Sequence, residues 1–309
     1  MAGSAGSWPA TSLPLPPPPP PRLDPGMPGP AAGPGIGKRP RPAMPSFLSR
    51  TTRSRRRRGR RPLPSAWLAT LESRVAYYQV LPAREQAELR GMVGVLMGEV
   101  SFEAGAGLAA VDETMQILIA AQAGVLLLHR PLADLPRIET AIVYPGAYHA
   151  RETRHTQEGV EVEEDEERLG EAWSYGTLLL SGEDVLYDSI HIDDGTNVVF
   201  HEVAHALDAQ TGESDGVPLL ADQEAVEAWR QAFGAALDAL GADLQRRRKT
   251  LLGAYAAEDE AEFFAAATET FFERPVSFQA VYPDLYPLMR DFYQLDPLTW
   301  AHLLRRAGA

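Results

Sequence analysis

The stretch Asn197-Val-Val-Phe-His201-Glu202-Val-Ala-His205-Ala-Leu-Asp208 contains His-Glu-x-x-His in a setting typical of a buried helix. At about 100° per residue, positions four apart lie one turn above each other, so His201 and His205 project from one helix face. Two imidazoles at this spacing can bind one zinc ion, and Glu202 on the flank can reach a water on that ion. Apolar residues fill most of the other positions, as expected of a helix that holds metal ligands in a core.

The composition of the chain limits the classes of protein to consider. Of its 309 residues, 45% are hydrophobic, which is enough for one large domain or two small ones. No stretch approaches 18 uninterrupted apolar residues, so the sequence predicts no membrane-spanning segment. The chain has no cysteine, which excludes disulfides, thiolate metal sites and cysteine nucleophiles. From these features we expect a cytoplasmic protein.

Charge is divided unevenly along the chain. Residues 1–61 hold 12 Lys/Arg and one acid, whereas the remaining 248 residues hold 17 bases and 41 acids, a charge of −24. The cluster Arg55–Arg58 is of a kind that can bind nucleic acid. The strongly acidic remainder argues against nucleic acid as a partner, so we interpret the basic segment as a solvated tail.

The sequence predicts two regions of different kinds. Residues 1–64 are dominated by Pro, Gly, Ala and Arg, and cannot bury enough apolar surface to offset their ordering entropy, so we expect a disordered tail. Residues 65–309 read as one folded domain of mostly helical α+β class with a small sheet. We expect strands at 138–144 and 172–181, an acidic solvated loop at 152–168, and helices that begin at Ser65 and Pro82 or span 114–129, 181–187, 224–240, 259–272, 284–293 and 298–306.

A catalytic zinc takes three protein ligands and keeps a fourth position for water, so a third ligand is required. One arrangement, His-x-x-Gly-x-x-His, is absent, because Asp208 and Thr211 stand where its Gly and last His would be. A second takes Asp208 itself as the ligand. Three ligands stacked on one rigid helix converge poorly on an ion, so we favour Asp208 as an acceptor that orients a ligand imidazole.

The third arrangement takes a Glu from a separate downstream helix. Glu262 lies between Ala261 and the Phe263-Phe264 pair, where a carboxylate is costly to bury unless it is paired or bound to metal. Glu258 and Glu260 lie nearer the predicted helix start, where exposed acids interact favourably with the helix dipole.

A series of separated motifs occurs in order along the chain: Phe102-Glu103, Val143-Tyr144-Pro145-Gly146, Gly170-Glu-Ala-Trp173, the 197–208 stretch, Asp215-Gly216, Tyr255-Ala-Ala, Ala261-Glu-Phe-Phe264, Glu269-Thr-Phe-Phe-Glu273 and Asp291-Phe-Tyr with Asp296-Pro297. Together they resemble the Mlc titration factor A family of zinc-dependent peptidases, whose catalytic core is similar to the C-terminal domain of anthrax lethal factor. The resemblance covers about residues 65–302 and leaves the Pro/Arg-rich tail outside.

The resemblance implies a zincin-like metallopeptidase fold of the gluzincin type. It makes His201, His205 and Glu262 the Zn²⁺ ligands, Glu202 the general base and Tyr255 a catalytic tyrosine. It implies a peptide substrate and an aminopeptidase-like activity. It also implies a transcriptional repressor of sugar uptake as a second partner. The alternative is a non-catalytic binding protein that titrates a transcription factor, and an intact set of zinc-binding residues favours the enzyme.

Overall fold

The computed structural model of the protein describes residues 46–146 and 176–301. The predicted acidic loop at 152–168, the start of the strand at 172–181, the end of the helix at 298–306 and most of the predicted tail lie outside these ranges. Within the described ranges, no helix combines the length and the apolar character needed to cross a bilayer.

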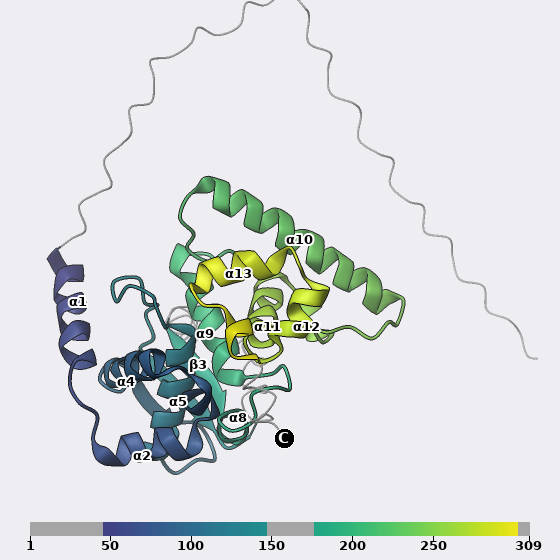
Figure 1. The fold of residues 1–309 in the computed structure, drawn as a ribbon. Helices are drawn as coiled ribbons and strands as arrows, with labels where there is room; N and C mark the ends of the chain where they lie inside the picture. Colours follow the sequence, from purple (N-terminus) through teal and green to yellow (C-terminus); the bar gives the residue numbers. More distant parts are fainter. Residues whose placement is uncertain (1–45, 147–175, 302–309) are drawn as a thin grey trace, which may run out of the picture. The chain divides into compact units, whose positions relative to one another are not determined.

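Helices and three short strands make up the first part of the described chain (Figure 1). The elements are α1 (Ser46–Gly59), α2 (Ser65–Arg74), α3 (Ala76–Val80), α4 (Ala83–Leu96), β1 (Ser101–Ala104), α5 (Glu113–Leu126), β2 (Thr140–Tyr144) and β3 (Thr177–Ser181). Helix α4 packs against α1 and against α5.

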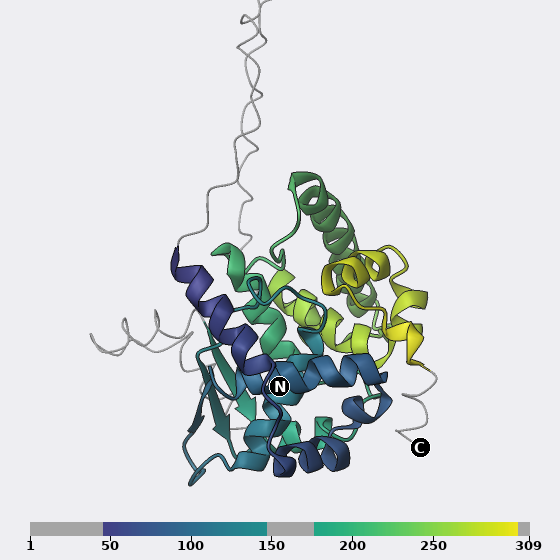
Figure 2. The same ribbon diagram turned by 60° about the vertical axis from the view of Figure 1, so that its left-hand side comes forward.

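The three strands form one parallel sheet in the order β1-β2-β3, and Figure 2 shows them as neighbouring arrows. Thr140 of β2 pairs with Ser101 of β1 and with Thr177 of β3, which fixes the register on both sides. Parallel strands need a long crossover, and α5 supplies the one between β1 and β2. Because β3 comes last in this strand order, it lies at an edge of the described sheet.

The second part of the described chain is helical. It consists of α8 (Gly182–Asp188), α9 (Val198–Asp208), η1 (Ala209–Thr211), α10 (Gln223–Gln245), η2 (Tyr255–Ala257), α11 (Glu260–Glu273), α12 (Pro275–Val281), α13 (Leu285–Tyr293) and η3 (Pro297–Thr299). With the small parallel sheet, these helices confirm the predicted mostly helical α+β class.

Helix α9 lies in the core, between β3 and α5 on one side and α11 on the other. Helix α5 is buried at every position from Ile117 to Leu126, as expected from its nearly uniform apolar sequence. On the opposite side, Phe200 of α9 packs on Phe272 of α11, with ring centroids 5.4 Å apart. This packing sets the distance between the two helices that carry the candidate ligands.

The loop that follows α9 holds the start of α11 in place. Gly216 has φ of 70°, and a Cβ there would lie 2.3 Å from the Glu260 carbonyl oxygen, so only glycine fits this approach. Its own carbonyl accepts a hydrogen bond from Trp229 Nε1 of α10 at 2.9 Å. The turn at Gly216 therefore contacts both α10, through Trp229, and the first residue of α11, Glu260.

Residues 46–59 differ from the prediction of a structureless tail up to residue 64, because they form α1 and pack on α4. The Arg55 guanidinium is largely buried and donates to Glu99 Oε2 and to the Leu132 carbonyl, each at 2.9 Å. A Cβ at Gly91 would lie 2.9 Å from Gly59 O, so two glycines let the helices approach closely. The rest of the predicted division between tail and domain stays a prediction.

Candidate metal site

Three backbone N–H groups at the start of α9 donate hydrogen bonds to side-chain oxygens. Asn197 is the N-cap, and its side-chain oxygen accepts from the Phe200 N–H at 3.0 Å. The Val198 N–H donates to Asp188 Oδ2 at 2.8 Å, and the Asn197 N–H donates to Glu269 Oε2 at 2.6 Å. These bonds satisfy backbone donors that a helix start leaves unpaired and fix which face of α9 is turned toward α11.

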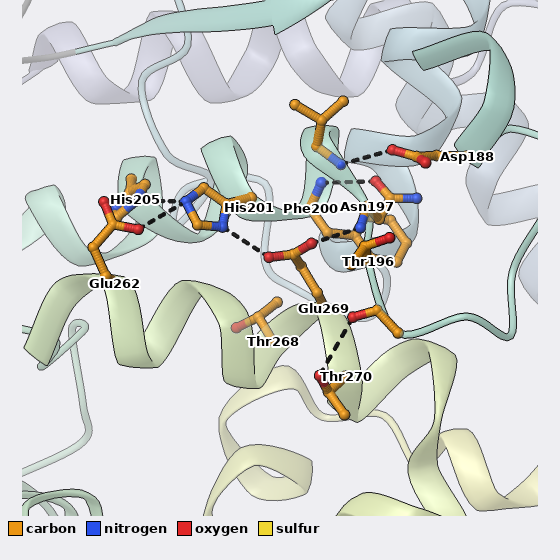
Figure 3. Close-up of polar contacts among 12 residues, drawn as sticks. Asp188, Thr196, Asn197, Phe200, His201, His205, Glu262, Thr268, Glu269 and Thr270 are labelled. Atoms are coloured by element: carbon orange, nitrogen blue, oxygen red, sulfur yellow. Dashed lines mark hydrogen bonds and ion pairs between the residues drawn. The ribbon is translucent and has the colours of Figure 1, made fainter. Parts of the chain in front are cut away.

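His201, His205 and Glu262 meet between α9 and α11. His201 Nε2 lies 3.1 Å from His205 Nε2 and 3.0 Å from Glu262 Oε2, and His205 Nε2 lies 3.4 Å from Glu262 Oε1. In the described ranges, this is the only group of three or more His, Asp or Glu residues whose ligand atoms all lie within 4.8 Å of one another. Figure 3 shows the two imidazoles and the carboxylate turned toward one another.

The donor atoms fit a tetrahedral metal ion. Ligands at about 2.0–2.1 Å from zinc in a tetrahedron are roughly 3.3 Å from one another, and the three measured separations lie close to that value. Glu262 Oε2 is buried, and its contact with His201 Nε2 does not have the geometry of a hydrogen bond. Two imidazoles and one carboxylate that share a centre are a donor set suited to zinc.

The electrostatics of the site couple the carboxylate to the imidazoles. Burial lowers the pKa of His201, but its interactions with Glu262 and Glu269 outweigh burial and raise that pKa to about 10. Burial raises the pKa of Glu262, yet its interactions with His201 and His205 outweigh burial and hold it well below its usual range. Glu262 is therefore an ionised carboxylate, the form that binds metal.

The two other predicted site residues, Glu202 and Tyr255, come from α9 and η2. Glu202 is buried on α9, and its Oε2 accepts from the Leu179 N–H of β3 at 3.4 Å. Tyr255 lies in η2, is 42% exposed, and its ring centroid is 5.9 Å from that of His201. The Glu202 carboxylate therefore lies beside the edge strand β3, and the partly exposed Tyr255 ring lies near the His201 ring.

Asp208 does not orient either histidine, so our interpretation of its role was wrong. Its Oδ2 accepts from the Gly216 N–H at 2.8 Å, and its Oδ1 has no hydrogen-bond partner among the described residues. The chain turns back after η1 and brings the Gly216 N–H to this carboxylate, which a helix-face argument could not foresee. Burial raises the pKa of Asp208 to about 6, although the Gly216 hydrogen bond lowers it.

Glu269 holds the position that we expected for Asp208, and sequence reasoning missed it. Its Oε1 accepts from His201 Nδ1–H at 2.8 Å. A usable signal was present, since Glu269 lies seven residues after Glu262, about two helical turns, within a run of apolar residues.

The family model described as glucose-regulated metallo-peptidase M90 matches residues 49–294 of this chain. The chain belongs to this metallopeptidase family. Over 239 residues it is 34% identical to the uncharacterized protein slr2042 of Synechocystis, covering 77% of this chain and 86% of that protein.

Two relatives carry the name Mlc titration factor A. The one from Pectobacterium atrosepticum is 33% identical over 191 residues, covering 61% of this chain and 71% of the relative. The one from Escherichia fergusonii is 34% identical over 160 residues, covering 51% of this chain and 59% of the relative. These matches confirm the family resemblance, and membership of a metallopeptidase family implies a metal ion.

Proposed function

We propose that this protein is a zinc-dependent peptidase of the gluzincin type, in which His201, His205 and Glu262 bind Zn²⁺. The observation that carries the proposal is the convergence of these three side chains, with separations of 3.0–3.4 Å, in a chain of a metallopeptidase family. The ligands come from two helices packed in the core, so the site is held rigidly.

We propose roles for the other site residues that the family resemblance implies. When bound, zinc lowers the pKa of a water and polarises the scissile carbonyl. Glu202 accepts the proton of the attacking water and passes it to the leaving amine. The Tyr255 phenol donates a hydrogen bond to the oxyanion that develops on the carbonyl.

The edge strand supplies a binding surface for the substrate. Strand β3 pairs with β2 along one side, and its Leu179 N–H faces Glu202. An extended peptide added along β3 would therefore place its backbone next to the general base. We propose peptide substrates and an aminopeptidase-like activity in the cytoplasm, as the family resemblance implies.

The experiment that tests this function is hydrolysis of a panel of fluorogenic aminoacyl substrates and longer quenched peptides. We expect activity that a chelator removes, that added zinc restores, and that Glu202→Gln abolishes. Cleavage of the aminoacyl substrates supports the aminopeptidase assignment, and cleavage of the longer peptides alone overturns it. Activity that is equal in Glu202→Gln, or insensitive to chelation, contradicts the peptidase proposal.

A second role concerns a protein partner. The name Mlc titration factor A, carried by two relatives, supports binding of a transcriptional repressor of sugar uptake. We expect Glu202→Gln to retain that binding, because the substitution removes one proton acceptor and leaves the surface unchanged. Repressor binding by a chain without peptidase activity would favour a non-catalytic titrating protein, and no measurable association with such a repressor contradicts the second role.

A further inference from the structure

Helix α11 presents carboxylates to α9 at intervals along one face. Glu262 and Glu269 are seven residues apart, which at 3.6 residues per turn is about two turns, so they share a face. Figure 3 shows His201 between them, with Glu262 toward one ring nitrogen and Glu269 toward the other. One helix thus contacts both nitrogens of one imidazole.

The contact to Glu269 determines which ring nitrogen of His201 keeps its proton when the other nitrogen binds a metal ion. Glu269 Oε1 lies 2.8 Å from His201 Nδ1, a geometry that suits an Nδ1–H donating to this carboxylate oxygen. In a neutral imidazole, the other nitrogen then holds the lone pair. That nitrogen, Nε2, is the one that faces His205 and Glu262.

Glu269 is itself held from a second direction. Its Oε2 accepts from the Asn197 N–H at 2.6 Å, and the His201 N–H donates to the Asn197 carbonyl at 3.0 Å. The carboxylate therefore spans the first turn of α9, from its N-cap to the imidazole. Its side chain is only 12% exposed, so water competes little for these bonds.

We propose that Glu269 is a positioning residue that holds His201 in the Nδ1–H form with Nε2 aimed at the metal position. This inference rests on the proposed zinc site and assigns a role to a residue outside the ligand set. Helix α11 then supplies both a ligand, Glu262, and the acceptor that orients another ligand. Removing such an acceptor typically costs about 10–100-fold in metal affinity.

Glu273 offers a matched control, because it lies one turn beyond Glu269 on the same helix. It accepts from the Gly195 N–H at 3.1 Å and from Asn197 Nδ2 at 3.4 Å, and it is 2% exposed. It holds the same loop and the same cap residue but contacts neither histidine. A role that consists only of joining α9 to α11 would therefore be shared by Glu273.

The test compares Glu269→Ala, Glu269→Gln and Glu273→Ala in the full chain. Zinc affinity is measured by competition with a chromophoric chelator, and NMR of the zinc-loaded protein detects the His201 Nδ1 proton. We expect Glu269→Ala to lose about 10–100-fold in affinity and to show a rapidly exchanging Nδ1 proton. Glu269→Gln, whose amide oxygen can still accept from His201 Nδ1–H, should recover most of both, and Glu273→Ala should change neither.

Two results would overturn the assignment. One is wild-type affinity with a protected Nδ1 proton in Glu269→Ala. The other is an equal loss of affinity in Glu273→Ala, which would show that the carboxylates only hold the helices together. A wild-type chain that binds zinc but cleaves no peptide would contradict the proposed function and leave this assignment intact. A chain that binds no zinc overturns both.

Discussion

The residues around His201 perform chemistry that can be separated by near-isosteric substitutions. Glu202→Gln should keep zinc, because Glu202 is not among the converging ligands, and should abolish turnover, because an amide cannot accept the proton. Tyr255→Phe should keep both zinc and the fold, with a loss of about 10²–10³ in kcat, the usual effect of removing one oxyanion donor. Steady-state kinetics of the two variants check this order, and full activity of Tyr255→Phe would exclude a catalytic role for that tyrosine.

Glu262 and Asp208 were rival candidates for the third ligand, and their substitution should have opposite effects. Glu262→Ala should bind zinc much more weakly, because it leaves two imidazoles as the only ligands. Asp208→Ala should keep zinc but unfold more easily, by about 1–3 kcal/mol, because the Gly216 N–H loses its buried acceptor. Chelator competition and denaturant unfolding measure the two quantities. Weak zinc binding by Asp208→Ala and tight binding by Glu262→Ala would reverse the assignment.

Residue-level reasoning selected the converging side chains where a local feature carries the signal, and their role as ligands stays a prediction. The histidine spacing and the apolar neighbours of Glu262 are visible in the sequence, and the structure brings these three residues together. The role of Glu269 depends on the pairing of α9 with α11, and that of Asp208 on a turn that returns to it. Both contacts join residues from different elements. Spacing along one helix could place Glu269 on the same face as Glu262, but it could not show which residue either carboxylate contacts.

At the scale of elements, α1 is the feature that sequence reasoning missed. Its arginines look solvated in the sequence, yet Arg55 and Arg58 both pair with Glu99, at 2.9 and 3.2 Å. We expect a chain that begins at Ser46 to be more stable than one that begins at Pro62, by about 1–3 kcal/mol, because the shorter chain leaves Glu99 and the α4 surface uncovered. Denaturant unfolding tests this, and equal midpoints would show that α1 contributes no stability.

Asp188, whose carboxylate accepts from the Val198 N–H at the start of α9, should make the protein less stable as the pH rises. Burial raises the pKa of Asp188 to about 7, against 3.8 for an exposed carboxyl. The folded state therefore binds this proton more tightly than the unfolded state. The stability that the proton contributes is complete below the ordinary pKa of 3.8 and is lost as pH rises from there through about 7.

Asp188→Asn removes the charge while its carbonyl oxygen can still accept from the Val198 N–H. At about pH 8 we expect the variant to be more stable than the wild type by about 1–3 kcal/mol, and at about pH 4, close to the ordinary pKa of 3.8, nearly equal to it. Asp193→Asn, at an exposed carboxylate nearby, is the control and should change little at either pH. Stability curves across this pH range measure the difference, and a variant that is less stable at high pH contradicts the account.

At the scale of the whole described molecule, the class was predictable and several elements were not. Strand β1 has only four residues, of which only Phe102 is partly buried, so its pairing with β2 rather than its own pattern makes it a strand. Helix α12 is absent from the prediction because Pro275 follows the predicted helix at 259–272, and proline ordinarily marks the end of a helix. Pro275 lies instead at the first position of a new helix, where proline lacks no needed hydrogen bond.

The central claim is that His201, His205 and Glu262 hold one zinc ion, and anomalous diffraction at the zinc absorption edge tests it most directly. Crystals of the zinc-loaded protein should show one strong anomalous peak per chain, at about 2.0–2.2 Å from both His Nε2 atoms and from a Glu262 carboxylate oxygen. A peak at Asp208, or the lack of any peak between α9 and α11 in zinc-loaded crystals, would contradict the account.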